Sequence, residues 1–88
     1  THHGESDFIR ELKSGSIKAL SALYDIYASE LYAYCVSVTK QREDAEEIVQ
    51  DVFMQLWLYR TQIRAEQTIR KLLFVMAKHR LINAFRTT

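Results

Sequence analysis

The scarcity of proline and glycine limits what this chain can fold into more than any other feature of its sequence. Its 88 residues include no proline and only two glycines, at positions 4 and 15. Tight turns rely on these two residue types, and residues that favour helices make up long stretches of the chain. We therefore expect an all-α fold, a compact bundle of about four helices joined by short loops.

The length of the chain allows one domain with a modest core. Apolar residues make up 48% of the sequence, which is ordinary for a globular protein and too high for a disordered one. We assign residues 6–88 to this domain. Residues 1–5 are expected to be a disordered N-terminus or, because they include His2 and His3, the remnant of an expression tag.

A Ser-Gly-Ser segment at residues 14–16 separates the first two predicted helices, over residues 6–13 and 17–39. Gly15 can take the left-handed conformation that ends a helix. Ser16 then follows as the N-cap of the second helix.

Acidic residues mark the start of a third predicted helix. It is expected to begin near Asp44, which together with Glu47 fits an acidic variant of the capping box. Residues 60–67 lack helical periodicity and predict a loop, after which a fourth helix is expected over residues 69–86.

Apolar residues spaced three or four positions apart predict the buried face of each long helix. In the second helix these are Ile17, Leu20, Tyr24, Tyr27, Leu31, Tyr34 and Val38. In the third they are Ala45, Ile48, Val49, Val52, Leu56 and Tyr59. In the fourth they are Leu73, Phe74, Ala77, Leu81, Ala84 and Phe85.

The net charge of +1 hides an uneven distribution of charge along the chain. Residues 43–51 carry five acidic residues and no basic one, whereas residues 70–86 carry five basic residues and no acidic one. One interpretation is that the two helices bind two partners of different charge. The other is that the acidic and basic helices complement each other within the fold.

Another face of the third helix mixes polar and apolar residues. Glu47, Gln50, Asp51 and Met54 fall together at steps of three and four, and Trp57 and Leu58 extend this face. Because tryptophan is enriched in binding hot spots, the face is a candidate interface. The alternative is that Trp57 packs against the second helix.

The sequence offers no constellation of residues for catalysis, so we expect no enzyme activity, cofactor or metal. Cys35 is the single cysteine and is expected to pack as a small apolar side chain, in a reducing compartment. No apolar run is long enough to span a membrane, and no signal peptide is visible, so membrane insertion is not expected.

Two segments of the chain resemble a known family. Residues 44–57, DAEEIVQDVFMQLW, resemble region 2.2 of extracytoplasmic-function sigma factors, members of the sigma-70 family, which typically reads D-A-E-D-L-V-Q-E-x-F-x-x-x-W. Residues 72–86, LLFVMAKHRLINAFR, resemble regions 2.3 to 2.4, W-L-x-x-I-A-[RK]-N-x-x-x-D-x-x-R. The spacing between the segments also fits, and the resemblance covers residues from about Phe8 to Arg86.

The resemblance implies a transcription initiation factor that binds core RNA polymerase. The third helix would dock on the clamp helices of the largest polymerase subunit. Polar contacts would come from Glu47, Gln50 and Asp51, and the apolar part from Phe53, Leu56 and Trp57.

The resemblance also implies recognition and melting of the promoter −10 element. The loop at residues 60–67 would receive a flipped base of the non-template strand, and the fourth helix would hold that strand. The implied DNA-binding residues are Arg64, Lys71, Leu72, Lys78, His79, Arg80, Asn83 and Arg86. Leu72 stands where the family usually has an aromatic residue, and His79 and Asn83 stand at its Asn and Asp positions.

The resemblance carries further expectations about context. It implies a bacterial, cytoplasmic protein, with an anti-sigma factor as a further partner. The family's second domain, a helix-turn-helix region 4, is expected to be absent from this chain. The alternative to the sigma interpretation is a helical protein-interaction module without DNA binding.

Overall fold

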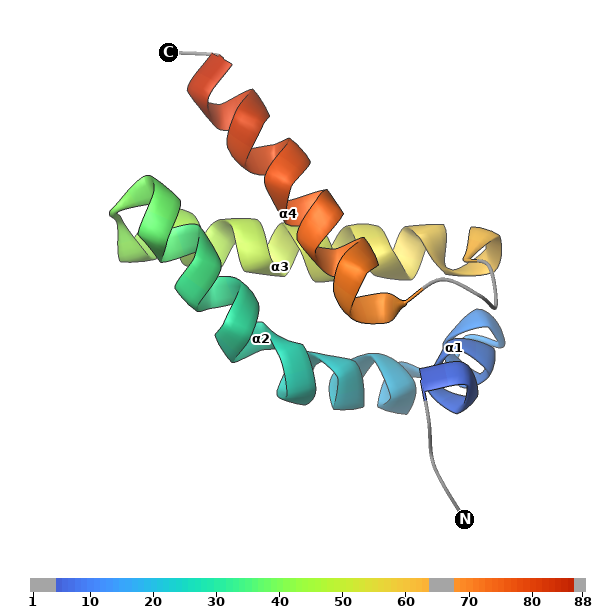
Figure 1. Ribbon diagram of the computed structural model, residues 1–88. Coiled ribbons are helices and arrows are strands. Elements are labelled where there is room, and N and C mark those ends of the chain that lie inside the picture. Colours follow the sequence, from blue (N-terminus) through green and yellow to red (C-terminus); the bar gives the residue numbers. More distant parts are fainter. Residues whose placement is uncertain (1–4, 64–67, 87–88) are drawn as a thin grey trace.

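Four α-helices make up the fold in the computed structural model, which describes residues 5–63 and 68–86. They are α1 (Glu5–Lys13), α2 (Ile17–Thr39), α3 (Arg42–Tyr59) and α4 (Ile69–Arg86), with a 3-10 turn, η1 (Arg60–Gln62), after α3. Figure 1 shows α2 and α3 connected by a tight link at one end of the molecule, with α4 crossing α3. No strand occurs within the described ranges, and the predicted all-α bundle is confirmed.

The link between α1 and α2 forms as its residue types predict. Gly15 has a φ of +96°, a left-handed conformation that side chains rarely tolerate. Ser16 caps α2, because its Oγ accepts a hydrogen bond of 3.1 Å from the Ala19 backbone N–H. The predicted limits of α2 are confirmed at both ends.

The predicted start of α3 is wrong by two residues. The helix begins at Arg42 after the N-cap Gln41, whose side chain makes no capping hydrogen bond. Asp44 is therefore not a cap but lies inside the first turn, where its negative charge interacts favourably with the positive end of the helix dipole. The reason is that Lys40, the C-cap that follows α2, has a left-handed conformation with a φ of +62°, which reverses the chain within two residues.

The core lies where α2, α3 and α4 meet, and the buried side of α2 differs from the prediction. Its buried residues lie four or eight positions apart, at Ala19, Leu23, Leu31 and Cys35. Of the predicted stripe, Ile17 is 62% exposed and Tyr24 and Val38 are also exposed, while Leu20, Tyr27 and Tyr34 are half-buried. Because α2 carries apolar residues around most of its circumference, spacing within the helix did not identify the face that packs.

The predicted buried faces of the other two long helices are mostly correct. In α3 all the predicted residues are buried except the half-buried Tyr59, and Phe53 joins them. In α4 the buried residues are Ile69, Leu73, Met76, Ala77 and Leu81, whereas Ala84 is exposed and Phe74 is half-buried. The side chain of Phe85 lies outside the described part of the structure.

Smaller contacts complete the fold. Helix α1 packs against α2 and η1, and Ile63 is buried just after η1. Cys35 has no exposed surface, as predicted for a small apolar side chain, and burial raises the pKa of its thiol. Across the described residues, no helix is long and apolar enough to cross a membrane.

Candidate functional site

The outward face of α3 presents acidic, amide and apolar side chains together. Glu47, Gln50 and Met54 are exposed, and Leu58 at the end of the helix is 71% exposed. Asp51 and Trp57 are half-buried at the two edges of this face. We call these six residues the α3 face. Such a combination of exposed apolar side chains and carboxylates suits a partner with cationic groups around an apolar centre.

Two residues expected on this surface lie in the core instead. Leu56 has no exposed surface and Phe53 is 5% exposed, with its ring edge-on to Tyr24 at a centroid distance of 5.0 Å. Neither side chain has appreciable exposed surface for a partner to contact, so both support the α3 face from within the core. Met54 and Leu58 supply the exposed apolar area in their place, and the spacing of residues on the helix had already placed both on this face.

Trp57 partly fits both alternatives that the sequence left open, an interface residue and a residue packed within the fold. It is half-buried and packs at the margin of the core. The guanidinium of Arg60 lies over its ring at 4.1 Å from the centroid and donates a 2.8 Å hydrogen bond to the Trp57 carbonyl oxygen. A cation over the face of an indole is attracted by the ring electrons. Arg60, which the sequence did not single out, therefore fixes one face of the tryptophan at the end of α3.

The outward face of α4 is basic and apolar at the same time. Lys71, Lys78 and His79 are exposed, and between them Val75 and Ile82 are 41% and 44% exposed. We call these five residues the α4 face. Its lysines can hold phosphates while its aliphatic side chains contact bases.

The remaining residues expected to contact DNA have mixed positions. Leu72 is half-buried against the core, and Asn83 is exposed. Residues 64–67 of the expected loop, Arg64 among them, lie outside the described residues. Arg86 ends α4, and its side chain is likewise outside the described part of the structure.

Arg80 points to α3 rather than away from the domain. Its Nη1 lies 3.5 Å from Oδ2 of Asp51, and its Nε donates a 3.2 Å hydrogen bond to Oε1 of Gln55. Arg80, which was expected to contact DNA, thus forms an ion pair with Asp51, which was expected to contact polymerase. In this one place the acidic and basic helices complement each other, as the second interpretation of the charge pattern proposed.

A second ion pair fixes the start of α4. Arg70 donates hydrogen bonds from Nε and Nη2 to Oε1 of Glu30 on α2, the first over 2.8 Å, and its guanidinium lies 5.0 Å from the centre of the Phe74 ring. The hydrogen bond to Glu30 raises the pKa of Arg70. The Phe74 ring in turn packs against Tyr34 at 5.3 Å. These contacts hold the first turns of α4 on α2.

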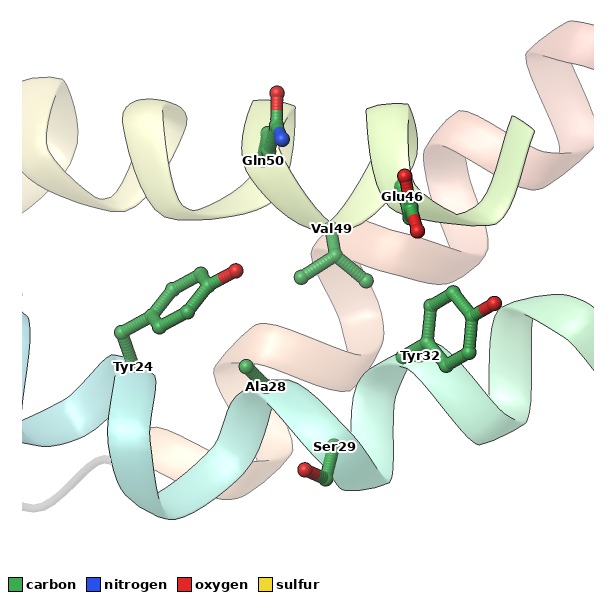
Figure 2. A pocket seen from close by; sticks show the side chains of 7 residues that line it. All are labelled: Tyr24, Ala28, Ser29, Tyr32, Glu46, Val49 and Gln50. Carbon is green, nitrogen blue, oxygen red and sulfur yellow. The ribbon is translucent and has the colours of Figure 1, made fainter. Parts of the chain in front are cut away.

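An open groove of about 480 Å³ runs between α2 and α3. Figure 2 shows Val49 pointing from α3 toward α2 between the rings of Tyr24 and Tyr32, with α4 passing behind the pair on the far side. Ala28, Ser29, Glu46 and Gln50 complete the lining. Gln50 thus lies at the border between the groove and the α3 face.

No candidate metal centre accompanies these surfaces in the described part of the chain. Among the described residues, no group of three or more His, Cys, Asp or Glu side chains gathers where a metal ion would be held. The two exposed faces lie on consecutive long helices and differ in charge.

Comparison with known families identifies this kind of domain. The family model for sigma-70 region 2 matches residues 23–88, three quarters of the chain, from the first third of α2 through both faces. The chain therefore belongs to the sigma-70 region 2 family, a family of transcription-initiation domains. The resemblance drawn from residues 44–57 and 72–86 is thereby confirmed at the level of the family. No curated protein matches the sequence.

Proposed function

We propose that this domain binds core RNA polymerase through the α3 face and the unpaired non-template strand of the promoter −10 element through the α4 face. The observation that carries the proposal is the presence of both exposed faces, acidic–apolar and basic–apolar, on neighbouring helices within the segment that matches sigma-70 region 2. An extracytoplasmic-function sigma factor acting in the bacterial cytoplasm fits the two sequence motifs.

The chemistry of the α3 face supports the polymerase half of the proposal. Carboxylates on Glu47 and Asp51 suit arginine side chains on the clamp helices, because guanidinium–carboxylate pairs give both orientation and free energy. Met54 and Leu58 are exposed enough to enter an apolar pocket on the partner. An anti-sigma factor that covers the same residues would inhibit the protein.

The chemistry of the α4 face supports the DNA half. Separating a base from its stack costs a few kcal/mol, so a protein that holds an open strand must offer bases a surface. Val75, His79 and Ile82 offer such a surface, with Lys71 and Lys78 beside it to hold phosphates. Leu72 is half-buried and not aromatic, so stacking at that position is not part of the proposal.

Charge reversal tests the polymerase half. In a binding assay of the folded domain with core polymerase, Glu47→Lys should weaken binding at least about tenfold, because it places like charge against a basic partner. Glu11 is an exposed residue of α1, far from the α3 face in the sequence. Glu11→Lys makes the same change in net charge and should bind like the wild type. A folded domain that fails to bind core polymerase would refute this half.

A strand-selectivity measurement tests the DNA half and the alternative of a protein-interaction module. At one stated salt concentration, the domain should bind a single-stranded −10 oligonucleotide more tightly than a scrambled strand of the same length. Lys78→Glu should weaken binding to both strands. Equal affinity for the two strands, together with intact polymerase binding, would favour the protein-interaction module.

A further inference from the structure

The groove between α2 and α3 combines aromatic, apolar and acidic groups in one concave surface. Ala28 and Val49 form its apolar part, and the rings of Tyr24 and Tyr32 lie on either side of Val49 (Figure 2). Glu46 is the one charged residue in the lining that the described chain provides, so the groove is negative. Its volume of about 480 Å³ is in the range of small-molecule sites, roughly 300–1,000 Å³.

The polar side chains of the groove are available to a ligand. Those of Ser29, Glu46 and Gln50 are exposed, and none of them forms a hydrogen bond or ion pair with the described part of the chain. The hydroxyls of Tyr24 and Tyr32 also have no hydrogen-bond partner there. A ligand that offers hydrogen-bond donors can therefore bind these groups in place of solvent, without breaking any contact within the protein.

A carboxylate and an aromatic ring lie together at one end of the groove. Figure 2 shows Glu46 on α3 at the same end as Tyr32 on α2. A cation is attracted both by the face of a tyrosine ring and by a carboxylate. A planar amidinium or guanidinium group can also donate two parallel hydrogen bonds to one carboxylate, which an ammonium group cannot. This end of the groove therefore favours a flat cation.

We propose that the groove between α2 and α3 is a binding site for a small planar organic cation of the amidinium or guanidinium class that carries an apolar or aromatic body. The cationic group pairs with Glu46 beside Tyr32, and the body lies on Val49 toward Tyr24. Because Gln50 borders both the groove and the α3 face, an occupant lies next to that face. The site belongs to the free domain and does not depend on the proposed function.

Titration of the free domain with benzamidine, followed by proton–nitrogen correlation NMR at one salt concentration, tests the proposal. Benzamidine joins an amidinium to a benzene ring and should bind saturably, with a dissociation constant of about 1 mM or lower. Its largest shifts should fall on the backbone amides of the residues that line the groove. Benzamide has the same ring and a neutral group of the same shape, and should bind at least about tenfold more weakly.

Three variants, each confirmed as folded by thermal unfolding, locate the site. Glu46→Gln keeps the shape of the side chain without its charge and should weaken benzamidine binding about three- to tenfold. Glu43→Gln removes an equal charge from the first turn of α3, outside the groove, and should bind benzamidine like the wild type. Tyr24→Leu removes the ring but leaves an apolar side chain against Phe53, and should weaken binding about two- to fivefold.

Three results would overturn the proposal. The first is the absence of saturable shifts up to about 10 mM benzamidine. The second is an equal loss of affinity in Glu46→Gln and Glu43→Gln, because binding would then follow net charge rather than the groove. The third is equal binding of benzamide, which would make the groove an apolar pocket and not a cation site. None of these results bears on polymerase or DNA binding, so the proposed function is tested separately.

Discussion

Two leucines on α3 show how sharply position within a helix determines the role of a residue. Leu56 has no exposed surface and Leu58 is 71% exposed, although they stand two positions apart. Each residue of an α-helix is rotated by about 100° from the one before, so residues two apart face nearly opposite directions. One helix can therefore supply the core with one set of side chains and a partner with another.

This division predicts opposite effects of two equivalent substitutions. Leu56→Ala should lower the free energy of unfolding by about 2–5 kcal/mol, because it leaves a cavity in the core. Leu58→Ala should change it by no more than about 0.5 kcal/mol and weaken polymerase binding about tenfold by removing an exposed apolar contact. Urea denaturation and the polymerase-binding assay measure the two effects. A Leu58→Ala variant that binds as well as the wild type would remove this residue from the interface.

The same two residues show what sequence could predict of the site. Helical spacing placed Leu56 inward and Leu58 outward, and the structure confirms both. The family motif, taken residue by residue, put Leu56 and Phe53 on the binding surface, because a motif records positions needed for the core as well as for contacts. The partner of Arg80 was not predictable, since it lies 25 to 29 positions earlier in the chain and the contact exists only after folding.

At the scale of helices, residues with special backbone preferences were predictable and ordinary residues in special conformations were not. The Ser-Gly-Ser segment correctly marked the end of α1 and the start of α2. At the other end of α2 the left-handed position is occupied by Lys40, a residue type that gives no such signal. The start of α3 was therefore misplaced at Asp44.

The conformation of Lys40 predicts a stabilising substitution. A left-handed conformation costs an ordinary residue roughly 1–2 kcal/mol and glycine very little. Lys40→Gly should therefore raise the free energy of unfolding, by about 1 kcal/mol at most because glycine also gains freedom in the unfolded chain. Lys40→Ala, which keeps the Cβ atom, is the matched control and should not stabilise. If urea denaturation finds the glycine variant no more stable than the alanine variant, the left-handed position is not strained.

Across the whole molecule, an almost neutral chain divides its charge between two surfaces. Its net charge is +1, yet Glu47 lies on the α3 face and two lysines lie on the α4 face. Composition correctly argued against a uniformly basic protein. It could not show which charges face partners and which, like Arg70 and Glu30, neutralise each other across 40 positions of sequence. That sorting is a property of tertiary structure.

The two exposed lysines of the α4 face predict how DNA binding depends on salt concentration. Each phosphate held on a single strand contributes about −0.7 to the slope of log K against log salt concentration. In the free domain Lys71 and Lys78 together should contribute about −1.4 to the slope, and Lys78→Gln should make it shallower by about 0.7. Fluorescence anisotropy of a labelled −10 oligonucleotide over a range of salt concentrations measures both. A slope of about −4 or steeper would mean that other cations dominate binding.

The stacking of Arg60 on Trp57 has a practical consequence. The chain has one tryptophan, and its indole is half-buried at the end of the surface proposed to meet polymerase, with a guanidinium over one side. The emission of that ring will respond to anything that displaces the guanidinium or excludes water from the indole. The domain thus carries an intrinsic optical reporter at the edge of its own docking surface, and its association with a tryptophan-free partner can be followed without attaching a dye.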